Sequence, residues 1–135
     1  MDRATVVDQL RAVLSTSSGV RLALLFGSVA RDQAKPGSDV DVALDAAAGV
    51  DVFGLAAQMS LAVGCEVHVV SLADPGVPLQ QELVRDAVVI HEGVPGAAAL
   101  WRSHTLADLE VDGPWYAHMR DSFLQRLAMQ RSDRG

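Results

Sequence analysis

Cysteine and aromatic residues are scarce in this sequence, and both scarcities limit what the chain can be. The single cysteine, Cys65, has no partner for an intramolecular disulfide, which excludes a disulfide-stapled fold and fits a reducing compartment. Aromatic residues make up 4% of the chain while hydrophobic residues make up 50%, so the core must consist of Ala, Val and Leu. We expect Cys65 to be a small buried hydrophobe at the start of a strand and not a nucleophile.

Long apolar runs and a signal peptide are also lacking, and basic residues are outnumbered. No stretch approaches the roughly 20 apolar residues that a membrane-spanning helix needs. The chain has 11 Lys and Arg against 17 Asp and Glu, for a net charge of −6. Broad nucleic-acid binding relies on basic residues that neutralise phosphates, so this charge argues against it. It does not exclude a nucleotide whose charge a metal screens. We expect a soluble cytoplasmic protein without membrane contact.

The pattern of apolar residues predicts one α/β domain, because 135 residues are too few for two comfortable ones. Helical spacing and β-rich runs alternate along the first two thirds of the chain. Helices are predicted at 2–16, from the Gly-Ser turn to about 33, at 51–63 and at 79–86, and strands at 21–26, 39–44, 65–72 and 87–91. We therefore predict a small mixed β-sheet covered by helices, with a core at 1–93 and a C-terminal helical extension of the same domain at 94–135.

The extension reads as helical from about 96 to 131, with Gly113 and Pro114 separating two helices. In the second helix, large apolar side chains recur every four residues, at Trp115, Met119, Phe123 and Leu127. The simpler interpretation is a helix that packs on its own domain. The alternative is a partner-binding face, because aromatic residues and methionine are enriched in interface cores.

The chemistry is concentrated between Leu22 and Leu44. A glycine that ends a strand, Gly27, lets a ligand approach the backbone closely. Ser28 can cap the helix that follows, whose first N–H groups would face a phosphate. By itself, a Gly-Ser step is more often only a turn between a strand and a helix.

Two carboxylates follow on the next strand. Asp39 and Asp41 share one face of it while Val40 and Val42 share the other, since side chains alternate along a strand. Two carboxylates so close repel each other, and a divalent cation such as Mg²⁺ would relieve that repulsion. An isolated Asp-x-Asp pair is more often a solvated strand face.

Gly27-Ser28, ten residues and Asp39-Val40-Asp41 together resemble the GS-x10-DxD signature of the nucleotidyltransferase superfamily related to DNA polymerase beta. The surrounding residues resemble most its minimal nucleotidyltransferase (MNT) group, often antitoxins paired with a HEPN-domain toxin. Arg31 matches the arginine common after Gly-Ser, whereas Asp32 replaces a common glycine. The resemblance extends loosely to His91. It implies Asp39 and Asp41 as metal ligands, and nucleotide contacts at Gly27, Ser28, Arg31 and Ser38.

The function that this resemblance implies is transfer of a nucleoside monophosphate, AMP from ATP, to a hydroxyl of a HEPN toxin, typically a tyrosine, with Mg²⁺. Two alternatives are an MNT-fold antitoxin that acts by binding with weak catalysis, and nucleotidyl transfer to a small molecule. A homo-oligomer could supply the pocket that the last alternative requires.

The third carboxylate of the superfamily is atypical here. Similar MNT sequences have an aspartate where His68 falls, and Glu66 lies two residues earlier on the same strand face. Either Glu66 is the third carboxylate, or a neutral His68 imidazole works there, or His68 is only a structural residue. Asp39, Asp41, Glu66 and His68 form the predicted catalytic set. The remaining histidines, at 91, 104 and 118, show no metal-ligand spacing.

Overall fold

The computed structural model describes residues 2–134, with side chains as far as Arg131. Four strands form one sheet in the order β3-β2-β1-β4. β1 is antiparallel to both of its neighbours, while β2 and β3 are parallel. The strands are β1 (Val20–Phe26), β2 (Val40–Ala46), β3 (Val67–Ser71) and β4 (Val88–Glu92). The predicted small mixed sheet is therefore confirmed.

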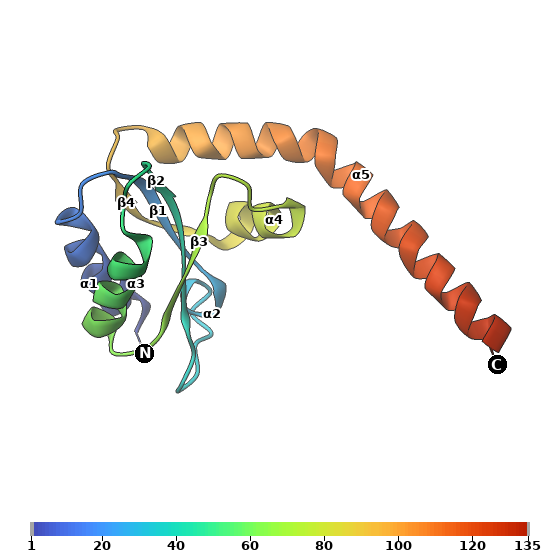
Figure 1. The fold of residues 1–135 in the computed structure, drawn as a ribbon, viewed down its shortest axis with the longest axis horizontal. Helices are drawn as coiled ribbons and strands as arrows, with labels where there is room; N and C mark the ends of the chain where they lie inside the picture. Colours follow the sequence, from blue (N-terminus) through green and yellow to red (C-terminus); the bar gives the residue numbers. More distant parts are fainter. Residues whose placement is uncertain (1, 135) are drawn as a thin grey trace.

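Helices cover both faces of the sheet (Figure 1). α1 and α3 pack together on one face, and α4 packs with the beginning of α5 on the other. The far end of α5 extends away from the sheet. The helices are α1 (Arg3–Ser15), α2 (Gly27–Ala30), α3 (Val52–Val63), α4 (Val77–Asp86) and α5 (Ala97–Arg134). No helix in the described part of the chain is long and apolar enough to cross a membrane.

Local signals explain where α1 and α3 begin and end. Asp2 and Asp51 are their N-caps, and each carboxylate accepts a hydrogen bond from a backbone N–H of the first turn. α3 ends at Gly64, whose left-handed φ of 76° is accessible to glycine at little cost. α3 thus links two parallel strands, the connection that parallel pairing requires.

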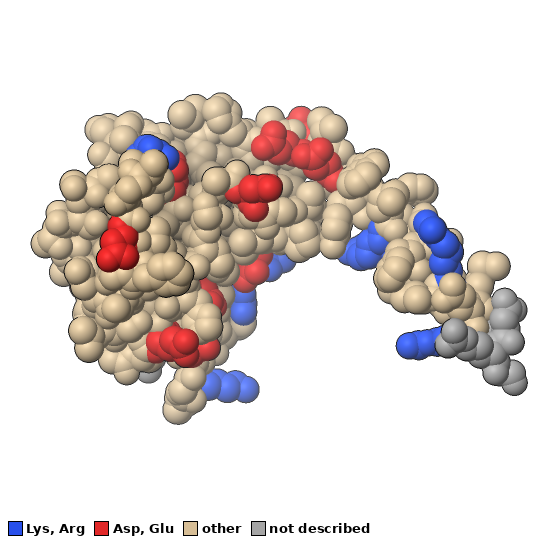
Figure 2. Space-filling model, viewed as in Figure 1, with Lys and Arg blue, Asp and Glu red and all other residues tan. Residues whose placement is uncertain are grey.

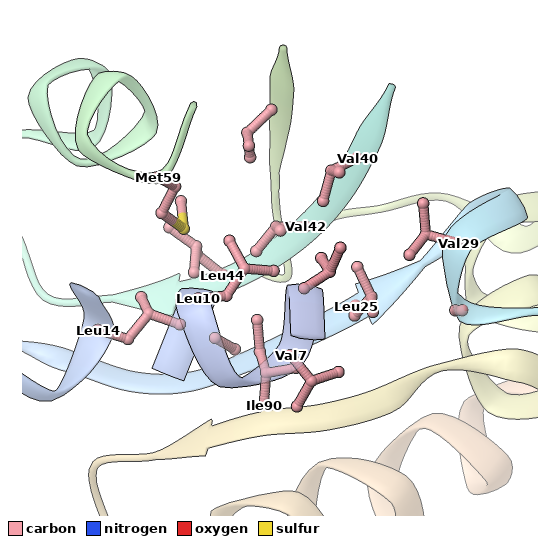
Figure 3. Packing of buried hydrophobic residues seen from close by; sticks show 14 of the residues in the cluster. Val7, Leu10, Leu14, Leu25, Val29, Val40, Val42, Leu44, Met59 and Ile90 are labelled. Atoms are coloured by element: carbon pink, nitrogen blue, oxygen red, sulfur yellow. The ribbon is translucent and has the colours of Figure 1, made fainter. Parts of the chain in front are cut away.

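The larger core lies between the sheet and the helices α1 and α3. Leu10 and Leu14 on α1 are fully buried, as the four-residue spacing of that helix predicts. Figure 3 shows them directed towards side chains of β2 and β1. On β2, Val40, Val42 and Leu44 face this core, while the buried Ala43 between them faces the other side of the sheet.

A second core lies on the opposite face, under α4 and α5. Leu22, Leu24 and Phe26 point into it, while Ala23 and Leu25 point into the first core. β1 therefore has both faces buried, which explains why its sequence is a continuous apolar run and does not alternate. On this face β2 contributes Asp41 to a position that is only partly buried.

Three local predictions are wrong. α2 is a single turn of four residues with Phe26 at its N-cap, so Ser28 lies inside the helix and does not cap it. β3 begins at Val67, so Cys65 precedes the strand and is only partly buried. α4 begins two residues before position 79, because Gly76 with its φ of 75° turns the chain there and Pro78 fits the first helical turn.

The C-terminal region also differs from its prediction. Gly113 and Pro114 do not separate two helices, because α5 is continuous with Pro114 inside it. The helix bends midway along its length (Figure 1), and proline bends helices since its ring clashes with the preceding turn and its nitrogen donates no hydrogen bond. The large apolar side chains of the predicted stripe beyond the bend are exposed and are not buried against their own domain. Phe123, for example, is 58% exposed.

Candidate functional site

The candidate site lies where β1 ends and β2 begins, on the sheet face covered by α4. Phe26 of β1 pairs with Asp41 of β2, so the Asp41 side chain lies directly against Gly27. A Cβ atom at position 27 would collide with the Asp41 carboxylate. Gly27 also has a left-handed φ of 77°. Both the close approach and the conformation therefore require glycine here.

The parallel pairing of β2 and β3 brings a second group of side chains to the same place. Asp41 pairs with His68, which sets the beginning of β3 beside the beginning of β2. His68 Nε2 lies 3.3 Å from Asp39 Oδ2 and 3.6 Å from Glu66 Oε1. The side chains of Asp39 and His68 are about half exposed, and that of Glu66 is 73% exposed. The structure thus brings together Asp39, Glu66 and His68, and Asp41 lies next to them in the register.

The donor set fits a divalent cation. One ligand atom from each of Asp39, Glu66 and His68 lies within 4.8 Å of the other two. Ligands at about 2.1 Å from a metal stand roughly 3.0 to 3.5 Å apart in octahedral or tetrahedral geometry. The separations of His68 Nε2 from the Asp39 and Glu66 carboxylates, 3.3 Å and 3.6 Å, are close to this range. Two carboxylates and an imidazole would hold Mn²⁺ or Zn²⁺ as well as Mg²⁺, since imidazole suits transition metals.

Asp41 is partly buried, whereas Asp39, Glu66 and His68 beside it are exposed. Burial raises the pKa of its carboxyl, because desolvation disfavours the charged form. The nearby carboxylates of Asp39 and Glu82 raise this pKa further, while His68 and Arg31 oppose the increase. The ionised Asp41 side chain is therefore held at a cost that a bound cation would reduce.

Arg31 lies at the C-cap of α2 and is held by α4. Its Nη1 donates a hydrogen bond to Glu82 Oε1 at 3.2 Å and lies 4.0 Å from Asp86 Oδ2. Sequence reasoning missed Glu82 and Asp86, which no motif marks. A weak signal existed only in the i, i+4 spacing of two acidic residues on one predicted helix.

The two serines of the predicted set differ in their surroundings. Ser28 is partly exposed within α2, and its carbonyl accepts a hydrogen bond from the Gln33 N–H at 2.8 Å. Ser38 Oγ accepts a hydrogen bond from the Lys35 N–H at 2.8 Å, which closes the loop before Asp39. The Ser38 hydroxyl keeps its own proton for donation to another acceptor.

A groove of about 650 Å³ opens on the same sheet face but at the opposite end of β1 and β2. Trp101, His104 and Thr105 of α5 line it, together with residues at the start of β1 and the end of β2. Leu22 in its lining precedes Phe26 by four residues, or roughly 13 Å along a strand. The groove is thus separate from the candidate site formed by Asp39, Asp41, Glu66 and His68, which we call the acidic site.

Comparisons with known proteins agree with this fold. Residues 8–93 match the family model described as polymerase beta, nucleotidyltransferase. A toxin–antitoxin structure with AMP-PNP matches with a TM-score of 0.70 at 20% identity, covering 92% of this chain and 99% of that one. A tri-AMPylated Shewanella oneidensis HEPN toxin in complex with an MNT antitoxin matches with a TM-score of 0.68 at 18% identity, covering 90% and 98%.

A shorter relative matches the core alone. A structure described as a minimal nucleotidyltransferase has a TM-score of 0.54 and 30% identity, and covers 65% of this chain and 95% of its own. No curated protein matches the sequence closely. The family model spans well over half of the chain, and the fold is that of the toxin–antitoxin and minimal nucleotidyltransferase structures. The chain therefore belongs to the polymerase beta nucleotidyltransferase family.

Proposed function

We propose that this chain is an antitoxin that transfers AMP from ATP to a hydroxyl group of a HEPN-domain toxin, using a divalent cation. The observation that supports this most directly is the convergence of Asp39, Glu66 and His68 beside Asp41 and Gly27. The sequence resemblance to MNT antitoxins and the similarity to structures of AMPylated HEPN toxin with its antitoxin support the choice of acceptor.

In the proposed site, Asp39, Asp41 and His68 would hold the cation, and the open backbone of Gly27 would accommodate the triphosphate. A bound cation would screen the charge of the triphosphate and polarise the phosphate under attack. Ser28 and Ser38 donate hydroxyl protons to phosphate oxygens. Arg31 stabilises the charge on the phosphates while Glu82 keeps the guanidinium in place.

The proposed reaction is a substitution at the α-phosphorus. The acceptor oxygen forms a bond to this phosphorus, the bond to the bridging oxygen breaks, and pyrophosphate leaves with the electron pair. The acceptor proton passes to Glu66, which is the most exposed of the clustered ligand residues. The protein contributes positioning and charge stabilisation, because the triphosphate already contains a good leaving group.

One observation favours an alternative, a binding antitoxin with weak catalysis. Position 68 holds an imidazole where the resemblance to MNT sequences implies a carboxylate, so the site has one negative charge fewer for a hard cation than that resemblance implies. Transfer to a small molecule is less well supported, because the groove that could hold one lies about 13 Å along β1 from the acidic site.

Intact-mass measurement after incubation with ATP, Mg²⁺ or Mn²⁺ and the HEPN protein of the adjacent reading frame tests the proposal. We expect the HEPN protein to gain the mass of one or more AMP groups. Asp39→Asn should reduce the initial rate at least about 1,000-fold, because the cation loses a charged ligand. Asp45→Asn is the matched control, since Asp45 lies near the other end of β2 in an exposed ion pair with Arg21.

The result separates the candidates. Neutralisation of the toxin without added mass would support the binding antitoxin, and full activity of Asp39→Asn would remove this site from the reaction. An adjacent frame that encodes no HEPN protein would favour the small-molecule alternative.

A further inference from the structure

The outer half of α5 exposes an apolar face that its own domain does not cover. We call residues 114–131 the α5 arm. Trp115 is 64% exposed, Met119 45%, Phe123 58% and Leu127 40%. Residues four apart lie about 40° apart around a helix, so these side chains form one gently winding stripe. Contiguous exposed apolar patches on a soluble protein are typical of interaction sites.

The charge of the α5 arm is opposite to that of the whole chain. The arm contains three arginines and one aspartate, although the net charge of the chain is −6. Figure 2 shows basic side chains along the outer part of α5 and acidic ones on its first part. The basic residues are Arg120, Arg126 and Arg131, and the acidic residue is Asp121.

Two of these arginines border the apolar stripe. Arg126 lies seven residues after Met119, and Arg120 lies seven residues before Leu127, so each is about 20° from a stripe residue. They lie on opposite sides of the stripe. A complementary surface is therefore an apolar groove with carboxylates along both edges.

A second copy of this chain does not meet that requirement on the α5 arm. A two-fold pairing of two arms places the same apolar stripe and the same arginines opposite each other. Like charges then face each other, which opposes association. The charge pattern favours a different, acidic protein.

The coverage of the matched structures indicates which of them have a counterpart of α5. The family model ends at residue 93, and the minimal nucleotidyltransferase structure covers 65% of the chain. The toxin–antitoxin structure with AMP-PNP covers 92% of the 135 residues, which exceeds a 93-residue core by about 31 residues. Much of α5 thus has a counterpart in that assembly, while a nucleotidyltransferase fold is complete without it.

We propose that the α5 arm is the docking surface for an acidic, apolar groove on the HEPN partner, an inference that rests on the function proposed above. The apolar stripe supplies contact area, and Arg120 and Arg126 supply orientation and charge complementarity. Docking and AMP transfer then reside in different parts of the chain, because the acidic site belongs to the sheet and the α5 arm extends away from it (Figure 1).

Titration calorimetry of the full chain with the HEPN protein, in the absence of ATP, tests the docking surface. Phe123→Asp should weaken binding at least about 30-fold, because it places a carboxylate in the centre of the stripe. Phe53→Asp is the matched control and should change affinity less than about 2-fold, since Phe53 is 91% exposed on α3. Arg126→Glu should weaken binding about 10-fold and reduce its dependence on salt.

A second measurement keeps docking and transfer distinguishable. Binding of a Mg²⁺ or Mn²⁺ complex of AMP-PNP should be the same for Phe123→Asp and the wild type, which also verifies that the variant is folded. If the HEPN protein binds through the α5 arm but gains no AMP, the transfer proposal fails and the docking surface stands. If Phe123→Asp binds and modifies the HEPN protein as the wild type does, the docking proposal fails alone.

Two further outcomes would overturn the docking proposal. One is a wild-type chain that does not bind the HEPN protein at all. The other is a wild-type homodimer that Phe123→Asp converts to a monomer without changing affinity for the HEPN protein, as measured by light scattering. The second result would assign the α5 arm to contact between copies of this chain.

Discussion

The core, formed by the sheet and the helices that pack on it, and the α5 arm contain the same helical spacing of apolar residues. These residues are buried in the core and exposed on the arm. On α1, apolar residues at helical spacing are buried, and Leu10 and Leu14 are fully inaccessible. On the α5 arm, the same spacing places Trp115 and Phe123 in solvent, with more than half of each exposed. Helical periodicity therefore identifies an apolar face, but what covers that face depends on which other elements lie within reach.

Chemistry and charge also divide between these two regions. The core presents carboxylates at the beginning of β2 and β3, where Asp39 and Glu66 flank His68. The α5 arm presents arginines beside apolar side chains. A cation site and a docking surface have different requirements, because ligands must be fixed within a few tenths of an ångström whereas a docking surface needs area. The rigid sheet suits the first and an extended helix suits the second.

The largest expected effect is a difference in stability between variants of the core and of the α5 arm. If the difference is absent, the contrast between a buried and an exposed apolar face is wrong. Leu10→Ala should lower the free energy of unfolding by about 3 kcal/mol, because it leaves a cavity in a closely packed core. Phe123→Ala removes a larger side chain but should change it by less than about 0.5 kcal/mol, since solvent already surrounds Phe123. Urea unfolding of both variants measures the difference.

Equal costs for the two substitutions would show that Phe123 is buried in solution. Repeating the urea unfolding at two protein concentrations is the control, because burial of Phe123 against a second copy of the chain would make the stability depend on protein concentration.

The fold of the core follows from local patterns in the sequence. The alternation Val40, Val42 and Leu44 predicted one buried face of β2, and the apolar run Leu22–Phe26 predicted a buried strand. The spacing of Gly27 and the two aspartates located the candidate site, whose ligand roles stay predictions. These features are readable because strands and turns impose short, strict periods on their residues.

The features that the sequence did not predict depend on distant parts of the chain or on competing local effects. Glu82 meets Arg31 across 51 residues, and only the packing of α4 on the sheet brings them together. Proline usually ends a helix, because it costs about 3 kcal/mol inside one, and Pro114 therefore predicted a break. Here α5 continues through it with a bend, so favourable residues on both sides outweigh that local cost.

The second prediction sharpens the contrast at the acidic site. His68→Asp should tighten Mg²⁺ binding about 10-fold and reduce the preference of the site for Mn²⁺ over Mg²⁺, because a carboxylate replaces an imidazole among the ligands. Calorimetry with each metal and AMP-PNP measures both effects. Affinity for the HEPN protein without nucleotide should be unchanged, since the α5 arm is unaltered.

His91→Asp is the control for the charge that the substitution adds, because His91 lies on β4 away from the ligand cluster. If the two variants bind metals alike, residue 68 lies outside the cation site. Glu66→Gln tests the role of Glu66. Loss of rate with intact metal affinity indicates a proton acceptor, and loss of both indicates a further metal ligand beside Asp39, Asp41 and His68.

The smallest expected effect concerns Asp41 in metal-free buffer. Its pKa is raised in the folded protein, mainly by burial, so the folded state binds a proton more readily than the unfolded state does. Stability therefore falls as the pH rises from below the unfolded pKa, about 3.9, through the folded pKa.

Asp41→Asn removes this loss, and it should raise the free energy of unfolding at pH 7 by less than about 1 kcal/mol, because the side chain is partly exposed. The advantage should shrink towards pH 3, where Asp41 is protonated in both states. Urea denaturation in buffer that contains EDTA, at pH 7 and at pH 3, measures the difference in free energy of unfolding. Asp45→Asn is the control on the same strand. A constant difference at both pH values would mean that Asp41 acts through packing and not through its charge.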